Sequence, residues 1–184
     1  SANRVNPWGH VIESGERGYF MGNRDYGDVW ITCSLRHPDG SAGPSDVSYR
    51  KLFFLDEATA LAAGHRPCGQ CRRKDYDVFK RFWGTVSETP MDPTLRTEFE
   101  AAANASAGHA SRRAEQLPPG AMCEVDGKAY LAWQRVAYLW SAGGYTVAGL
   151  LKDFGTVPVL TPPSTELVLE AGYRPWVHPS VMRA

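Results

Sequence analysis

The chain lacks long hydrophobic runs and lacks an excess of charge of either sign. Its 184 residues hold 20 Lys and Arg against 20 Asp and Glu, so the formal net charge is zero. No apolar stretch approaches the roughly 20 residues that span a bilayer, and the N-terminal residues lack the apolar core of a signal peptide. We therefore expect a cytoplasmic protein without membrane association. Zero net charge also argues against strong non-specific binding of nucleic acid, which depends on many phosphate contacts.

Cysteine is scarce as well, with four residues in the chain. Two of them form the close pair Cys68-x-x-Cys71. Without a secretion signal, this usage indicates a reducing compartment and metal binding rather than disulfides. Motifs for a hydrolase triad, a phosphate-binding loop or paired catalytic carboxylates are absent, so the sequence supports no named reaction.

Two pairs of metal-ligand residues stand out, Cys33 with His37 and Cys68 with Cys71. Two residues between Cys68 and Cys71 allow a tight turn to present both thiolates to one ion. Cys33 and His37 are four residues apart, a spacing that faces one side of a helical turn. Zn²⁺ accepts thiolate and imidazole, and a structural zinc site needs four ligands. The pattern predicts a zinc site on these four residues.

Other interpretations of these cysteines stay open. A redox pair would follow a strand directly and start a helix, whereas Arg66-Pro67 precedes Cys68 after a helix stop. The thiols can also be plain buried side chains. His65 and Cys123 compete with His37 for the fourth position. We favour His37 because local ligand pairs close small loops at low entropy cost.

Cys33-x3-His37, followed by A-L-A-A-G-H-R-P-C-x2-C over residues 60–71, resembles a known pattern. Residues 29–74 are similar to the Ada-type metal-binding domain of a bacterial DNA-repair and transcription-regulating methyltransferase. That domain holds one zinc on four cysteines, the first of which accepts a methyl group from methyl-phosphotriesters in DNA. The resemblance implies that Cys33 is the acceptor and that His37, Cys68 and Cys71 are the other ligands. Histidine in place of the second cysteine makes the site less negative and its sulfurs less nucleophilic.

Residues 64–84 are basic within this neutral chain, with six Arg or Lys and two Asp. Such asymmetry is typical of a phosphate-facing patch, and a solvated helix face with Arg66 capping carbonyls is the alternative. The candidate DNA-binding residues are Arg66, Arg72, Arg73, Lys74, Lys80 and Arg81. Because no helix-turn-helix or second methyltransferase domain follows, we do not expect this chain alone to regulate transcription.

The fold class predicted is α+β. We expect a zinc-binding module over 1–86, a helix and linker over 87–116, and a β-rich lobe with a short C-terminal helix over 117–184. In the module, we expect strands at 18–22, 29–32 and 49–55, a turn at 23–25, and helices at 57–63 and 72–83. Asp56 is a good N-cap for the first helix, and Gly64 is placed to end it in a left-handed conformation.

The second half of the chain starts with a helix expected at 95–105, capped by Asp92 or Thr94, and a linker at 104–113. Asp126-Gly127 is a strong hairpin signal, and a third strand follows at 136–140. This pattern predicts a β meander or partial barrel. Residues 169–175 repeat the helix-stop pattern of 61–67, with Ser164 as the expected N-cap.

The sequence is compatible with three functions of different classes. In the first, a zinc protein associates with DNA and repairs or senses alkylation through Cys33. In the second, zinc is purely structural, and a cleft between module and β lobe acts on nucleic acid or nucleotide through residues such as Arg24, Glu98 or His178. In the third, the chain is a small interaction module without chemistry. An exposed, reactive Cys33 thiolate favours the first function, and a buried one shielded by N–H bonds favours the other two. The sequence leaves the oligomeric state open.

Overall fold

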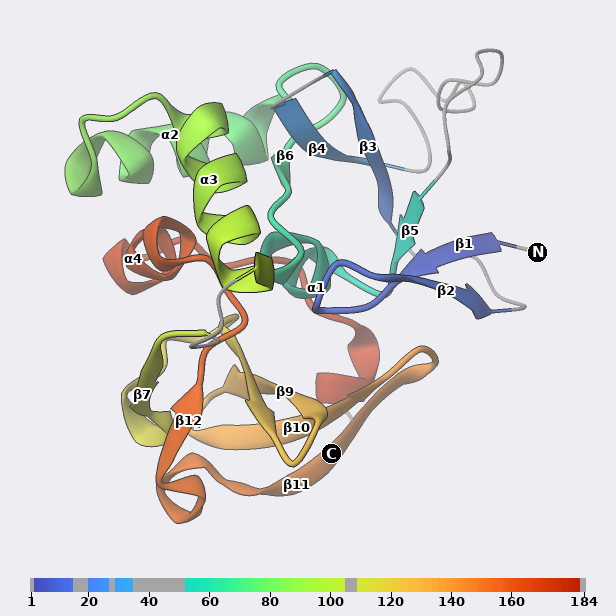
Figure 1. Ribbon diagram of the computed structural model, residues 1–184, viewed down its shortest axis with the longest axis vertical. Helices are drawn as coiled ribbons and strands as arrows, with labels where there is room; N and C mark the ends of the chain where they lie inside the picture. Colours follow the sequence, from blue (N-terminus) through green and yellow to red (C-terminus); the bar gives the residue numbers. More distant parts are fainter. Residues whose placement is uncertain (1, 15–19, 27–28, 35–51, 105–108, 183–184) are drawn as a thin grey trace.

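The computed structural model describes residues 2–14, 20–26, 29–34, 52–104 and 109–182. In these residues the chain combines helices with a mixed sheet, an antiparallel meander and a short two-stranded ribbon (Figure 1). The α+β class predicted from the sequence is therefore confirmed. None of the helices in the described ranges is long and apolar enough to cross a membrane.

A six-stranded mixed sheet has the order β2-β1-β5-β3-β4-β6. Its strands are β1 (Ala2–Val5), β2 (Val11–Ser14), β3 (Phe20–Tyr26), β4 (Val29–Ser34), β5 (Leu52–Phe54) and β6 (Arg66–Pro67). The β1–β5 and β4–β6 pairs are parallel, and the others are antiparallel. The turn predicted at 23–25 is wrong, because β3 continues to Tyr26. The register of β3 against β4 shifts between Asn23 and Tyr26. This local irregularity accommodates the polar residues 23–25 within the strand.

The first helix, α1 (Glu57–Ala62), begins at the predicted residue and ends one residue before the predicted end. The Asp56 carboxylate accepts the Thr59 N–H at 2.9 Å and caps the N-terminus. Gly64 adopts a φ of 78°, and its N–H donates to the Leu61 carbonyl at 3.0 Å. A Cβ at Gly64 would lie 3.1 Å from Phe99, so both the backbone and the space require glycine here.

Replacement of Gly64 with alanine is expected to lower the free energy of unfolding by about 1–2 kcal/mol, because the left-handed conformation strains any residue with a Cβ. Gly84 is the matched control, since it lies in a helix with nothing within 4 Å of an added Cβ. Gly84→Ala should stabilise the protein by about 0.5 kcal/mol through helix propensity. Urea denaturation measures both, and equal effects at the two positions would contradict the left-handed stop.

Three further helices cover the module and the centre of the molecule, α2 (Arg73–Val86), α3 (Met91–Asn104) and α4 (Pro163–Ala171). In α2, Phe79 and Trp83 are buried as the helical spacing predicts. The predicted start of α3 is wrong by four residues, because Pro93 fits within the first turn of a helix. Ser164 is not the N-cap of α4: it lies inside the helix and donates its N–H and hydroxyl to Glu98.

The β lobe forms the base of the molecule in Figure 1. Its meander is built from β8 (Met122–Val125), β9 (Lys128–Trp133), β10 (Val136–Ser141) and β11 (Gly144–Leu150), and their order confirms the predicted meander. Asp126 and Gly127 both have positive φ, as the predicted two-residue hairpin requires. The linker predicted at 104–113 is wrong at its end, because β7 (Ser111–Arg113) pairs with β12 (Thr156–Pro158).

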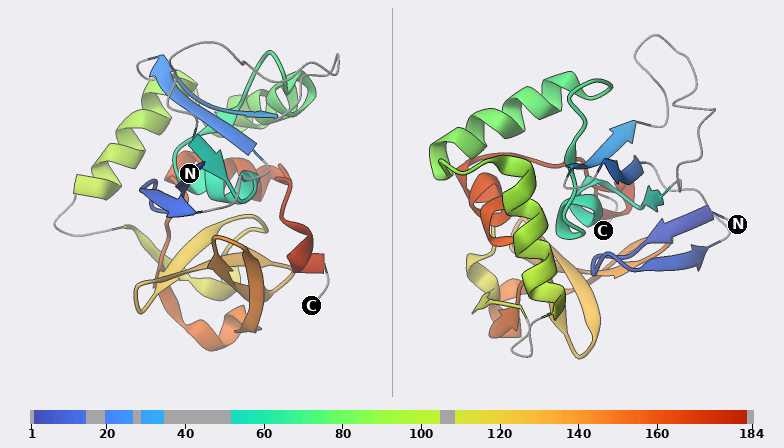
Figure 2. Two further views of the ribbon diagram at one scale, coloured as in Figure 1. Left: turned by 90° about the vertical axis from the view of Figure 1, so that its right-hand side faces the viewer. Right: turned by 45° about the horizontal axis from the view of Figure 1, so that its top comes forward.

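Three short 3-10 helices complete the described part, η1 (Ala114–Gln116), η2 (Leu151–Phe154) and η3 (Pro179–Met182). After α4 the chain passes α1 and returns to the β lobe, where η3 packs against β11 (Figure 2). The C-terminal segment therefore touches both the helical centre and the meander.

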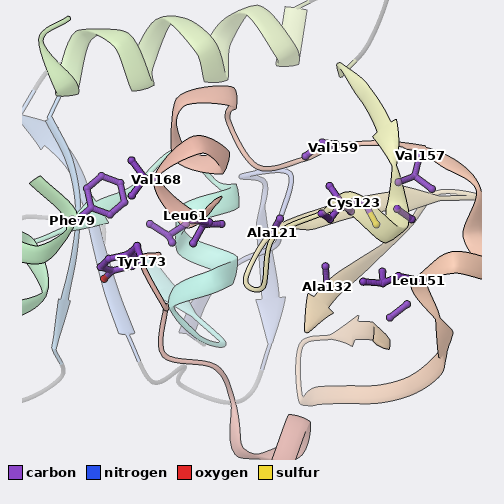
Figure 3. Packing of buried hydrophobic residues seen from close by; sticks show 14 of the residues in the cluster. Leu61, Phe79, Ala121, Cys123, Ala132, Leu151, Val157, Val159, Val168 and Tyr173 are labelled. Atoms are coloured by element: carbon purple, nitrogen blue, oxygen red, sulfur yellow. The ribbon is translucent and has the colours of Figure 1, made fainter. Parts of the chain in front are cut away.

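One hydrophobic cluster joins the helices to the β lobe. Phe79 and Tyr173 lie at one end of this cluster, and Cys123 and Val157 lie at the other (Figure 3). The rings of Phe79 and Tyr173 meet edge to face with centroids 5.1 Å apart. This core is continuous. The packing that fixes the position of α2 therefore also fixes the antiparallel meander of the β lobe.

Candidate metal centre

Cys33, Cys68 and Cys71 come together in the folded chain. Their sulfur atoms all lie within 4.8 Å of one another. Cys33 is in β4, and the other two lie in the turn between β6 and α2. The parallel pairing of β4 with β6 sets Thr32 opposite Pro67, and the Cys68 N–H donates to the Thr32 carbonyl at 3.0 Å. The next side chains on the two strands are therefore Cys33 and Cys68.

Backbone N–H groups point at two of the three sulfurs. The N–H of Gln70 donates to the Cys68 sulfur at 3.4 Å, and the N–H of Cys71 also bonds to it. The N–H of Ser34 bonds to the Cys71 sulfur. Each of these N–H groups stabilises negative charge on sulfur, so these bonds favour the thiolate form of Cys68 and Cys71.

The three thiols influence one another's pKa. Hydrogen bonds from the thiols of Cys33 and Cys71 lower the pKa of Cys68 far below its ordinary value. Contacts with Cys68 and Cys71, followed by burial, raise the pKa of Cys33. Without a cation, one thiolate in the cluster therefore opposes ionisation of the next. A bound divalent cation removes this opposition, so the donor set fits a metal ion.

Exposure differs among the three cysteines. Cys33 is 9% exposed and Cys68 is 5% exposed, whereas Cys71 is half-buried. The sulfur that the Ada-type resemblance assigns as a methyl acceptor is thus among the two buried ones. Burial of Cys33 favours a structural role for the cluster, although the N–H bonds described above reach Cys68 and Cys71.

Both competitors for the fourth ligand are placed elsewhere. The Nδ1 atom of buried His65 lies 2.9 Å from the Ala63 carbonyl oxygen, and its ring packs against Phe54. Cys123 is fully buried in β8 within the core of Figure 3. Over the described ranges, no fourth Cys, His, Asp or Glu joins the cluster. His37 lies outside the described residues and stays the predicted ligand, although Cys33 lies in a strand and not in the expected helical turn.

Burial raises the pKa of Cys123 to about 12, so its thiol stays protonated and inert at pH 8. We expect iodoacetamide at pH 8 to leave Cys123 unmodified in the folded protein and to alkylate it after unfolding. Peptide mass mapping measures the modification. Rapid alkylation of Cys123 under native conditions would contradict its placement in the core.

Two of the predicted DNA-binding residues form internal ion pairs. Arg66 is 8% exposed, and its guanidinium binds both carboxylate oxygens of Asp92, at 2.7 and 3.0 Å. Arg72 is 6% exposed and pairs with Glu57 and Asp75, each at 2.8 Å. The sequence analysis missed these acidic partners. Their contacts make Arg66 and Arg72 part of the protein's own architecture.

The other four predicted cations are exposed on α2: Arg73, Lys74, Lys80 and Arg81. Arg73 and Lys80 are seven residues apart, as are Lys74 and Arg81, so they form two adjacent rows on one helix face. Arg73 also pairs with Asp77 at 3.0 Å along this surface. We call the four residues the basic face of α2.

The residues suggested for a cleft between the lobes do not share a described site. Both carboxylate oxygens of Glu98 accept hydrogen bonds from Ser164, and Glu98 lines a cavity of about 320 Å³ with His109 and Glu166. His178 instead donates its N–H to Asp56 at 3.1 Å, near α1. The side chain of Arg24 lies outside the described part.

Fold and cluster together define an α+β protein with a three-cysteine site that can hold a metal ion. No protein-family model, characterised protein or solved structure matches the chain. The resemblance to the Ada-type domain therefore rests on the sequence motif in residues 29–74.

Proposed function

We propose that the protein holds a zinc ion on Cys33, Cys68, Cys71 and His37. This ion fixes the position of α2, which carries a DNA-binding face. The observation that supports this most strongly is the convergence of three sulfurs within 4.8 Å from two separate parts of the chain. Thiolate ligands favour zinc over magnesium or calcium, which prefer oxygen. The zinc ion, when bound, keeps the thiolates deprotonated at neutral pH and cross-links β4 to the turn before α2.

The link to DNA follows from the position of α2. Its first residue, Arg73, comes two residues after Cys71, so the cysteine turn fixes the N-terminal end of the helix. The basic face presents four cations over two turns of this helix, with the rows about 10 Å long. Such an array can neutralise successive phosphates of a nucleic-acid backbone without reading bases.

A direct test is fluorescence anisotropy with duplex DNA over a range of salt concentrations. The triple variant Lys74→Ala/Lys80→Ala/Arg81→Ala should weaken binding at least about tenfold and flatten the salt dependence by about 0.9 for each phosphate that the variant no longer neutralises. The matched control is Lys128→Ala/Arg135→Ala/Lys152→Ala, which removes the same charge from exposed positions on the β lobe. Equal affinities of the two triple variants would contradict a binding face on α2.

Methyl transfer to Cys33 is a second candidate, favoured by the pattern of N–H bonds. These bonds reach Cys68 and Cys71 and reduce the nucleophilicity of both, whereas Cys33 is influenced most by the other two thiols. In this step the Cys33 thiolate forms a bond to the methyl carbon, the carbon–oxygen bond breaks, and the electron pair leaves on the phosphodiester oxygen. Because Cys33 is 9% exposed, the substrate must approach it closely for this reaction.

Mass spectrometry separates the two roles of Cys33. After incubation with DNA that bears methyl-phosphotriesters, a methyl acceptor gains one methyl group in place of its thiol hydrogen, a net mass of CH2, and Cys33→Ala does not. A protein that holds zinc but gains no methyl group has a structural centre, and the acceptor role is then wrong.

A further inference from the structure

A buried carboxylate holds the C-terminal segment against the start of α1. Glu57 is 1% exposed and accepts hydrogen bonds from the Tyr173 hydroxyl at 2.6 Å and from the Trp176 N–H at 2.9 Å. In return, the Glu57 N–H donates to the Trp176 carbonyl at 3.1 Å. These three bonds join residues that are more than a hundred positions apart in the chain.

A second buried carboxylate lies next to the first. Asp56 is fully buried, and one of its oxygens accepts the His178 N–H at 3.1 Å. Its other oxygen accepts the N–H and the hydroxyl of Thr59 in the cap of α1. Residues 173–178, which we call the C-terminal strap, are therefore tied to Asp56 and Glu57 through backbone and side-chain donors.

The cation that balances Glu57 comes from the cysteine turn. Arg72 follows Cys71 directly, and its N–H donates to the Cys68 carbonyl at 3.1 Å. Its guanidinium lies 2.8 Å from Glu57, with both side chains almost completely buried. Burial raises the pKa of Glu57, and the Arg72 guanidinium and Tyr173 hydroxyl oppose this effect. A buried carboxylate depends strongly on such a partner, because its charge has lost its hydration.

We propose that metal occupancy of the cysteine cluster controls docking of the C-terminal strap, with Arg72 and Glu57 as the connection. When the metal is lost, the turn that carries Arg72 loosens, Glu57 loses its fixed cation, and the strap opens to let water reach the carboxylate. This coupling rests on the metal-binding part of the proposed function and is independent of DNA binding. The exchange protection of the strap should therefore report whether the metal centre is occupied.

Hydrogen–deuterium exchange on the metal-loaded and chelated protein tests the coupling, with metal content measured in parallel by plasma mass spectrometry. Chelation should speed exchange in peptides covering the strap by about tenfold or more, and the β8–β9 hairpin should keep its protection. Metal loss that leaves exchange of the strap unchanged overturns the coupling, as does an equal increase throughout the hairpin. A chain that binds no metal overturns the proposed function itself, and the coupling with it.

Two neighbouring arginines provide a matched pair of variants. Arg72→Met should keep its metal and still show fast exchange in the strap, with little further change on chelation. Arg73→Met removes the same charge one residue later from an exposed position, and its strap should exchange as the wild-type strap does, both with metal and after chelation. Glu57→Gln, which keeps an acceptor for Trp176 but removes the charge, should also reduce the response to chelation. Wild-type protection of the strap in metal-loaded Arg72→Met would overturn the role of this arginine.

Discussion

Cys68→Ser is expected to abolish metal binding and to lower the free energy of unfolding by about 4 kcal/mol, the stabilisation from a ligand present at about 1,000 times its Kd. Cys68 is buried, accepts two backbone N–H bonds and contacts both other thiols. Its loss leaves Cys33, Cys71 and the proposed ligand His37, one fewer than the four ligands of a structural zinc site. Plasma mass spectrometry gives the metal content, and thermal unfolding gives the change in stability.

Cys123→Ala is the control for this variant, because Cys123 is also buried but lies in the core of the β lobe. It should keep the metal content of the wild type and lose about 1 kcal/mol through the small cavity that it creates. If Cys68→Ser kept its metal, or if Cys123→Ala lost it, the three-cysteine centre would be wrong.

Asp56→Ala is expected to lower the free energy of unfolding by about 4 kcal/mol. The change removes the N-cap of α1, worth about 1 kcal/mol, and leaves the buried Thr59 hydroxyl and the partly buried His178 N–H without their acceptor, at about 1–3 kcal/mol each. Because Asp56 is fully buried, water does not replace the missing bonds without opening the structure. Urea denaturation followed by tryptophan fluorescence measures the effect.

The exposed Asp77 serves as the control for Asp56, since its surface ion pair with Arg73 is the kind that contributes little. Asp77→Ala should change stability by no more than about 0.5 kcal/mol. A loss in Asp56→Ala as small as that in Asp77→Ala would mean that the strap is not anchored to the start of α1.

Features with a local cause could be predicted from the sequence. Asp56 caps α1 and Gly64 ends it because each acts on residues within one turn of itself. Asp126-Gly127 makes its hairpin for the same reason. Cys68 and Cys71 share a tight turn that their spacing alone requires, and the β4–β6 pairing then brings Cys33 to them.

Features that depend on distant partners were missed. Arg66 and Arg72 have the composition of a phosphate-binding patch, yet Asp92 and Glu57 take up their charges in the fold. Glu57 in turn meets Tyr173 and Trp176, more than a hundred residues away. Nothing in the local pattern distinguishes a buried arginine with a carboxylate partner from an exposed one.

Errors at the ends of elements have simple physical causes. We expected a helix only from residue 95 onward, but proline is tolerated in the first turn of a helix, so α3 begins at Met91 and includes Pro93. The polar residues of 23–25 suggested a turn, but β3 continues through them with an irregular register. In β3, pairing with β4 and β5 outweighed a residue preference worth about 1 kcal/mol or less.

Native mass spectrometry of the purified wild-type chain, sprayed from neutral buffer without added metal, tests the zinc centre most directly. We predict one zinc ion per chain, released on acidification as the thiolates take up protons. A chain that retains no metal at neutral pH, with its cysteines reduced, would contradict the zinc centre and the functions built upon it.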